Sequence, residues 1–124
     1  MTLEILPYRL TVCKVADVTE ISVTSDCYFL GKTDEEISLV CRTENAPHHT
    51  IERSDGWRGF RIQGTIDFSL VGILAGISTV LAENQIGIFA VSTYNTDYIL
   101  VREDDLTRAT AALEAAGYHV IWSE

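Results

Sequence analysis

Side chains of the kinds that perform catalysis occur in two short stretches of this sequence. Asp104 and Asp105 are adjacent carboxylates, and the hydroxyls of Ser92 and Thr93 come shortly before Asp97. Paired carboxylates serve acid–base chemistry, whereas a hydroxyl nucleophile needs a base beside it. The two aspartates are explained more simply as negative charge at the start of a helix, and no histidine stands near the hydroxyls. The sequence therefore predicts no catalytic residues and a protein that is not an enzyme.

A catalytic site assembled from distant residues is the remaining enzymatic alternative. It would require side chains such as His119 and Asp97 to lie within hydrogen-bond reach of each other. The sequence contains no Gly-x-Gly-x-x-Gly motif, no Gly-x-x-x-x-Gly-Lys-Ser/Thr phosphate loop and no Gly-x-Ser-x-Gly motif. We therefore expect no cofactor.

Composition and charge limit the classes of partner. The chain has 124 residues and sets 9 Lys and Arg against 18 Asp and Glu, a formal net charge of −9. Nucleic-acid binding draws its affinity from clustered cations, so this balance argues against it. No apolar run approaches the ~20 residues that span a bilayer, and the first residues lack the cationic region of a signal peptide. We expect a cytoplasmic protein that binds neither nucleic acid nor a membrane.

Cysteine and histidine residues could bind a metal, but their spacing does not favour this. Cys13, Cys27 and Cys41 lie in apolar strand-like runs and form no Cys-x-x-Cys unit, so buried free thiols in a reducing compartment are expected. His48 and His49 are adjacent in a polar loop, without a cysteine or carboxylate at ligand spacing. The sequence predicts no metal site.

The second half of the chain alternates between strand and helix patterns. Apolar residues at helical spacing follow Leu70, and Asp67 or Ser69 is expected to cap this helix. A second helix is expected from Leu106 to its stop at Gly117, with an inward stripe of Leu106, Ala109, Leu113 and Ala116. Strands are expected at 57–66, 86–92, 98–101 and 119–122. The resulting order is strand, helix, strand, strand, helix, strand, which is a ferredoxin-like βαββαβ unit.

The first half of the chain is a fainter copy of this order. Its expected strands are 8–15, 26–32 and 37–42, with a hairpin turn at Thr33–Glu36 and a polar linker at 45–56. The predicted fold class is α+β, with two tandem ferredoxin-like βαββαβ modules whose sheets are antiparallel. Residues 1–56 form a degenerate N-terminal module and residues 57–124 the second, with the strand at 57–66 shared by both or abutting the first.

Residues 57 to 122 resemble the ACT domain, the small ligand-binding module of regulated amino-acid enzymes. The match rests on 68–74 (FSLVGIL), 86–89 (IGIF), and 92–97 (STYNTD) leading into 99–101 (ILV), and continues through Asp104–Leu106 and Ala116–Gly117. It is similar to the version in the cytosolic arginine sensor (CASTOR) family and its small bacterial tandem relatives. Residues 1–56 match as the degenerate module that such proteins place in front.

The resemblance implies that a free amino acid binds where two ACT modules meet. Its carboxylate is received at a helix N-terminus, which corresponds by position to Asp67, Gly72, Ile73 and Leu74. Its cationic part is read by the loop before the third strand, which corresponds to the carbonyl groups of Thr93 and Tyr94 and to the carboxylate of Asp97.

Physical chemistry is compatible with these roles. Free N–H groups at a helix start attract an anion, and a glycine such as Gly72 lets a ligand approach the backbone closely. Asp97 could form a charge-assisted hydrogen bond with an ammonium or guanidinium group. Each residue also has a structural alternative, which is close helix packing for Gly72 and a turn that bonds its own backbone for Asp97.

The function implied is that of an amino-acid sensor that signals to a regulated protein. The arginine sensor has four modules and this chain has room for two, so a comparable interface would come from within the chain or from a homodimer. The alternative is an oligomerisation module whose ligand site no longer works.

Overall fold

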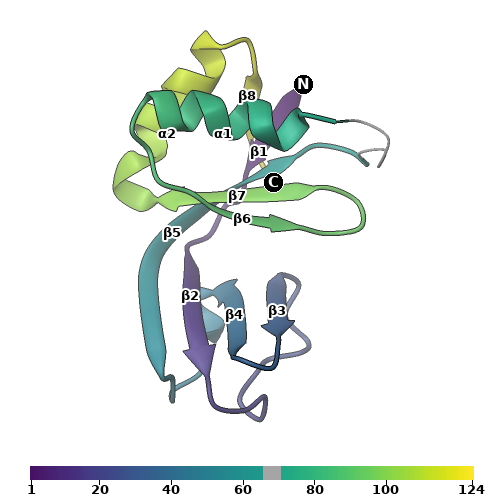
Figure 1. The fold of residues 1–124 in the computed structure, drawn as a ribbon, viewed down its shortest axis with the longest axis vertical. Coiled ribbons are helices and arrows are strands. Elements are labelled where there is room, and N and C mark those ends of the chain that lie inside the picture. The colour runs from purple at the N-terminus through teal and green to yellow at the C-terminus, as the bar shows by residue number, and fades with distance from the viewer. Residues whose placement is uncertain (66–70) are drawn as a thin grey trace. The chain divides into compact units, whose positions relative to one another are not determined.

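The computed structural model describes residues 1–65 and 71–124, and the chain divides into two compact units (Figure 1). The helical unit consists of Met1–Pro7 and Arg58–Glu124, and the strand unit consists of Tyr8–Trp57. The predicted boundary between residues 56 and 57 lies close to this division. Residues 1–7, however, belong with the C-terminal part of the chain rather than with the N-terminal module.

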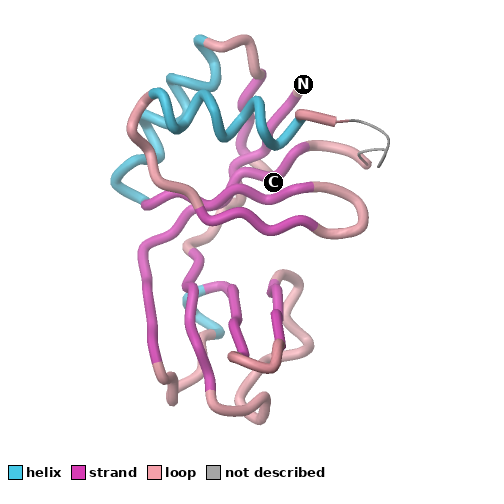
Figure 2. Tube along the Cα trace, viewed as in Figure 1, coloured by secondary structure: helices cyan, strands magenta, loops and turns pink. Residues whose placement is uncertain are grey.

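The strand unit is built from antiparallel strands and loops, with η1 (Thr43–Asn45) as its short 3-10 helix (Figure 2). Its strands are β2 (Leu10–Val15), β3 (Tyr28–Lys32), β4 (Ile37–Arg42) and the first residues of β5 (Glu52–Ile62), in the order β3-β4-β2-β5. The Thr33 N–H donates to the Glu36 carbonyl at 2.9 Å and closes the turn between β3 and β4. The predicted hairpin is confirmed.

The strand β5 begins earlier than its sequence pattern indicated. We predicted a linker at 45–56 and a strand at 57–66, whereas β5 runs from Glu52 to Ile62. Its polar first residues pair with β2, for example Glu52 with Lys14 and Ser54 with Val12. Because these residues carry no alternation of apolar side chains, backbone pairing rather than burial makes them a strand.

The helical unit has a mixed sheet rather than the antiparallel sheet that we predicted. Its strands are β1 (Thr2–Ile5), the last part of β5, β6 (Phe89–Ser92), β7 (Asp97–Arg102) and β8 (His119–Trp122). The strand β1, which we did not predict, pairs antiparallel with β5 and parallel with β8. It enters the sheet beside β8 and so creates the parallel pair.

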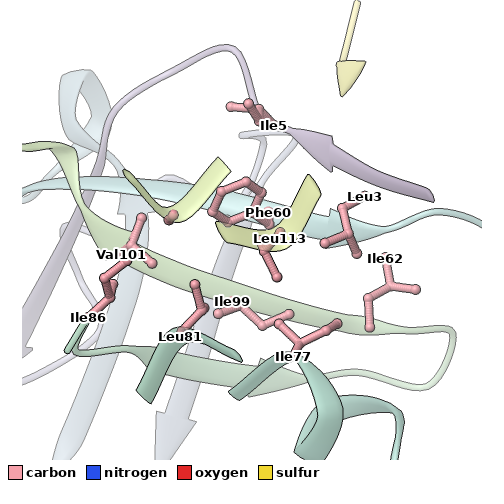
Figure 3. Close-up of a cluster of buried hydrophobic side chains, with 11 residues drawn as sticks. Leu3, Ile5, Phe60, Ile62, Ile77, Leu81, Ile86, Ile99, Val101 and Leu113 are labelled. Carbon is pink, nitrogen blue, oxygen red and sulfur yellow. The ribbon is translucent and has the colours of Figure 1, made fainter. Parts of the chain in front are cut away.

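Two α-helices cover one face of this sheet. They are α1 (Ile73–Glu83) and α2 (Leu106–Ala115), which is preceded by the 3-10 turn η2 (Glu103–Asp105). Their inward side chains share one apolar core with alternate residues of the strands (Figure 3), namely Leu3, Ile5, Phe60, Ile62, Ile77, Leu81, Ile86, Ile99, Val101, Ala109 and Leu113. The helical periodicity predicted these inward positions, except that Ala116 is exposed.

A glycine lies at the start of α1 and another just after the end of α2. Gly72 is the N-cap of α1 with φ of +80°, so the helix starts later than the predicted caps Asp67 and Ser69, which lie outside the described residues. Gly117 follows α2 with φ of +99°, and the stop predicted there is confirmed. Both residues adopt the left-handed region that glycine enters without steric cost.

Among the described residues, no helix combines the length and the apolar character of a bilayer-spanning segment.

Candidate functional site

The N-terminus of α1 is the first half of the candidate site. Gly72 is exposed, and a Cβ atom built on it would meet nothing within 4 Å. Because the cap residue is a glycine, it has no side chain that could bond the free N–H groups, and the first turn of α1 contains no acidic residue. Ile73 and Leu74 are half-buried against the core and anchor this turn. The helix start thus presents backbone N–H groups and the positive end of the helix dipole.

The turn between β6 and β7 is the second half. The Thr93 N–H and hydroxyl both donate to the Thr96 carbonyl, at 2.9 and 3.1 Å. The buried Thr96 hydroxyl donates to the Ile62 carbonyl at 2.8 Å, which ties the turn to the end of β5. Tyr94, at the tip, has 78% of its surface exposed. The turn is therefore held from inside the unit while its tip faces outward.

Asp97 begins β7 beside this turn. The Ser92 hydroxyl donates to Asp97 Oδ1 at 2.6 Å across the β6–β7 pair. A carboxylate has about four acceptor positions, so this bond orients Asp97 and leaves acceptor capacity for a ligand. The Ser92 hydroxyl and the Asp97 carboxylate, considered from the sequence as catalytic groups, are thus bonded to each other.

The structure places the two halves at the same end of the sheet. The turn is bonded to Ile62, and Figure 3 shows Ile77, from the first half of α1, near Ile62, while Leu81 lies toward Ile86 and Val101. The helix therefore starts at the end of the sheet where β5 ends and the β6–β7 turn lies. This end includes the predicted site residues that the structure describes, namely Gly72, Ile73, Leu74, Thr93, Tyr94 and Asp97. The remaining predicted residue, Asp67, is outside the described residues.

The two candidate catalytic residues named from the sequence, His119 and Asp97, lie on different strands of the described sheet. His119 is on β8 and Asp97 on β7, and β5 and β1 lie between these strands in the sheet. Three strand spacings of about 4.8 Å separate the two residues by roughly 14 Å. Asp105 accepts a hydrogen bond from Arg108 Nη2 at 2.9 Å within the start of α2. Asp105 thus has a structural role at the start of α2.

Sequence reasoning missed a polar hollow in the strand unit. Its volume is about 300 Å³, and its lining residues are Val15, Ala16, Asp17, Thr19, Glu20, Pro47 and His49. Glu20 accepts hydrogen bonds from the backbone N–H of His48 and pairs with His49 Nδ1 at 2.9 Å. The hydrogen bond with His49 lowers the pKa of Glu20. Nearly 30 residues separate Glu20 from the two histidines, so no local sequence pattern predicts the contact.

The three thiols lie in the strand unit and are free. Cys13 and Cys41 are buried, as predicted, whereas Cys27 is partly exposed. Burial, together with the nearby Cys13 thiol, raises the pKa of Cys41 to about 12. A buried thiol of this kind is chemically inert.

Solved structures resemble this chain along most of its length. Protein Atu0741 from Agobacterium tumefaciens superposes with a TM-score of 0.87 at 29% identity, over 99% of this chain and 93% of that protein. VC0802 from Vibrio cholerae, of unknown function and described as a possible transport protein, gives a TM-score of 0.75 at 22% identity, over 90% and 85%. No curated protein sequence matches significantly.

Two further comparisons concern the fold and the family. The regulatory subunit of aspartate kinase from Thermus thermophilus, in its ligand-free form, has a TM-score of 0.64 at 10% identity, over 93% of this chain and 96% of that subunit. At this identity the likeness shows the fold. The family model for the ACT domain matches residues 52–115, more than half of the chain. The chain belongs to the ACT domain family.

Proposed function

We propose that this protein is a regulatory protein that binds a free amino acid where α1 begins. ACT domains are regulatory amino-acid-binding modules, and the solved structures of this fold include a regulatory subunit of aspartate kinase. The observation that carries the proposal is Gly72, a cap without a side chain, at the same end of the sheet as Asp97. The proposed site thus pairs a binding site for an anion with a binding site for a cation.

The ligand in this proposal spans the two halves of the site. Its carboxylate binds the backbone N–H groups around Gly72, Ile73 and Leu74. Its ammonium or cationic group binds the carbonyl oxygens of Thr93 and Tyr94 and the carboxylate of Asp97. Asp67 joins the site by its position in the family motif.

A second copy of the chain covers the ligand in this proposal. Val71 and Tyr94, which adjoin the two halves of the site, have 90% and 78% of their surfaces exposed. Exposed apolar side chains beside a binding site are typical of surfaces that a partner covers. The homodimer would sense the amino acid at this seam and pass the signal to a regulated protein.

Thermal unfolding in the presence of each of the twenty standard amino acids tests the proposal. A ligand that binds the folded state alone stabilises it, by about 2.7 kcal/mol at a concentration ~100 times its Kd. We expect one amino acid, or one chemical class of amino acids, to raise the melting temperature in a concentration-dependent manner.

Matched variants locate the response. Gly72→Ala and Gly56→Ala introduce the same strain, about 1–2 kcal/mol, because both glycines have φ of +80° and open space around a new Cβ. Asp97→Asn removes one charge, as does Asp104→Asn at an exposed position away from the site. We expect only Gly72→Ala and Asp97→Asn to weaken the ligand-induced shift.

Two outcomes would contradict the proposal. One is a folded protein that responds to none of the amino acids. The other is a response that Gly72→Ala and Asp97→Asn leave as strong as their controls do. A ligand-independent dimer without a response would instead favour an oligomerisation module.

A further inference from the structure

The backbone groups on the outer edge of β3 in the strand unit pair with no other strand among residues 1–65 and 71–124. The strand β3 is terminal in the order β3-β4-β2-β5 and pairs with β4. The bond from Thr33 N–H to the Glu36 carbonyl sets which residues of β3 bond to β4, because bonded and non-bonded pairs alternate. By this alternation Phe29 and Gly31 bond to β4, and the N–H and C=O groups of Tyr28, Leu30 and Lys32 point outward.

This edge lacks two of the features that prevent strand pairing, a bulge and a proline. The register between β3 and β4 is continuous from Tyr28 to Lys32, without a bulge, and the strand contains no proline. Leu30, Gly31 and Lys32 are exposed, with 43% of the Leu30 surface accessible. An exposed, regular edge with an apolar side chain is a template for another strand.

The charges along this edge are complementary to themselves. If two copies of β3 pair antiparallel about Phe29, Lys32 of each copy lies opposite the partner's Asp26, and Tyr28 lies opposite the partner's Leu30. Asp26 bonds Arg42 at 3.1 Å, but 73% of its side chain is exposed and its carboxylate retains acceptor capacity. Opposite charges and aromatic–aliphatic pairs stabilise facing strands.

Neighbouring registers lose this match. Pairing about Leu30 places Asp26 opposite the partner's Asp34, which sets like charges against each other. Pairing about Tyr28 places Lys32 opposite the partner's Thr24, which has no charge. We propose that β3 is a self-association edge, which pairs with β3 of a second copy in the register centred on Phe29.

Disulfide trapping tests both the surface and the register. In the proposed register Cys27 faces the partner's Gly31 in a non-hydrogen-bonded pair, where Cα atoms are about 4.5 Å apart, within the range of a disulfide. A Cβ atom on Gly31 would meet nothing within 4 Å, so Gly31→Cys is tolerated. Mild oxidation with oxidised glutathione, which accepts the two electrons, should convert Gly31→Cys into a covalent dimer.

Two control variants accompany Gly31→Cys. Adding Cys27→Ser to Gly31→Cys should abolish the covalent dimer. Thr33→Cys reports the register centred on Leu30 and should cross-link poorly. Failure of Gly31→Cys to cross-link at high protein concentration, cross-linking without Cys27, or stronger cross-linking by Thr33→Cys would each overturn the proposal.

Charge exchange gives a second readout by sedimentation. Lys32→Glu sets two like-charge pairs in the proposed dimer and should weaken association roughly tenfold. Combining Lys32→Glu with Asp26→Lys should restore it, and a double variant as weak as the single one would contradict the pairing. These measurements are made without amino acids, so a ligand bound in the helical unit does not contribute to the association that they report.

Discussion

The helical unit and the strand unit stabilise their sheets by different means. In the helical unit, two helices and a mixed sheet enclose a core of large apolar side chains (Figure 3). In the strand unit, the buried cluster that includes two of the three thiols consists of Cys13, Val15, Leu39 and Cys41, with partly buried neighbours. A sheet without helical cover buries less apolar surface, so it needs polar contacts that hold its loops and strands together.

Those polar contacts are visible on the strand unit. The Thr11 hydroxyl is fully buried, donates to Asp55 Oδ1 at 2.6 Å and lies 2.9 Å from Thr43 Oγ1. The Arg42 guanidinium pairs with Asp26 at 3.1 Å and lies over the Tyr8 ring at 4.3 Å. We therefore expect the loss of apolar side chains to lower stability more in the helical unit, and the loss of hydrogen bonds to lower it more in the strand unit.

Matched leucine-to-alanine substitutions test this contrast between the units, and they have the largest expected effects. Leu113→Ala and Leu39→Ala remove the same atoms from sites with 0% and 1% exposure. Each should cost about 2–5 kcal/mol, with Leu113→Ala more costly because its larger, helix-covered core holds the cavity open. Urea unfolding followed by tryptophan fluorescence measures both. A larger loss for Leu39→Ala would contradict the contrast between the units.

Thr11→Val tests the polar side of the comparison with an isosteric change. It removes the hydrogen bond to Asp55 and should cost about 1–3 kcal/mol at neutral pH, whereas Thr107→Val on the exposed face of α2 should change stability by less than about 0.5 kcal/mol.

The cost of Thr11→Val should depend on pH. The Thr11 hydrogen bond lowers the pKa of Asp55, so its stabilisation is present above the ordinary aspartate pKa of about 3.9 and is lost as the pH falls through the lower folded pKa. The difference between the variant and the wild type should therefore shrink in acid. A difference that does not vary with pH would exclude this origin.

The smallest expected effect concerns Cys41. Its pKa is raised to about 12 by burial, so the folded state keeps the thiol neutral while the unfolded chain ionises it above about pH 8.5. This stabilisation is complete below that pH and is lost as the pH rises toward 12. Cys41→Ala should reduce the alkaline loss of stability, and a maleimide should label Cys27 before Cys41. Equal labelling of the two thiols would show that the cluster is open.

Local patterns were sufficient for the helices and the hairpins. The apolar spacing that includes Ile77 and Leu81 predicted α1, and the polar turn after Lys32 predicted the β3–β4 hairpin. The candidate site followed from a family motif rather than from spacing, and its residues from Gly72 to Asp97 proved to lie at one end of a sheet. Their sequence separation carried no such information, because the pairing of β7 with β5 brings the β6–β7 turn to Ile62.

The sequence by itself determined which segments are helical, where α2 ends, and that the apolar faces require burial, because periodicity and glycine conformation are local properties. Only the tertiary structure decided that β1 joins the C-terminal part of the chain and makes its sheet mixed. It also decided that the polar residues from Glu52 form a strand, and that Gly72 rather than a polar side chain starts α1. Pairing between distant strands depends on backbone groups, which every residue type shares.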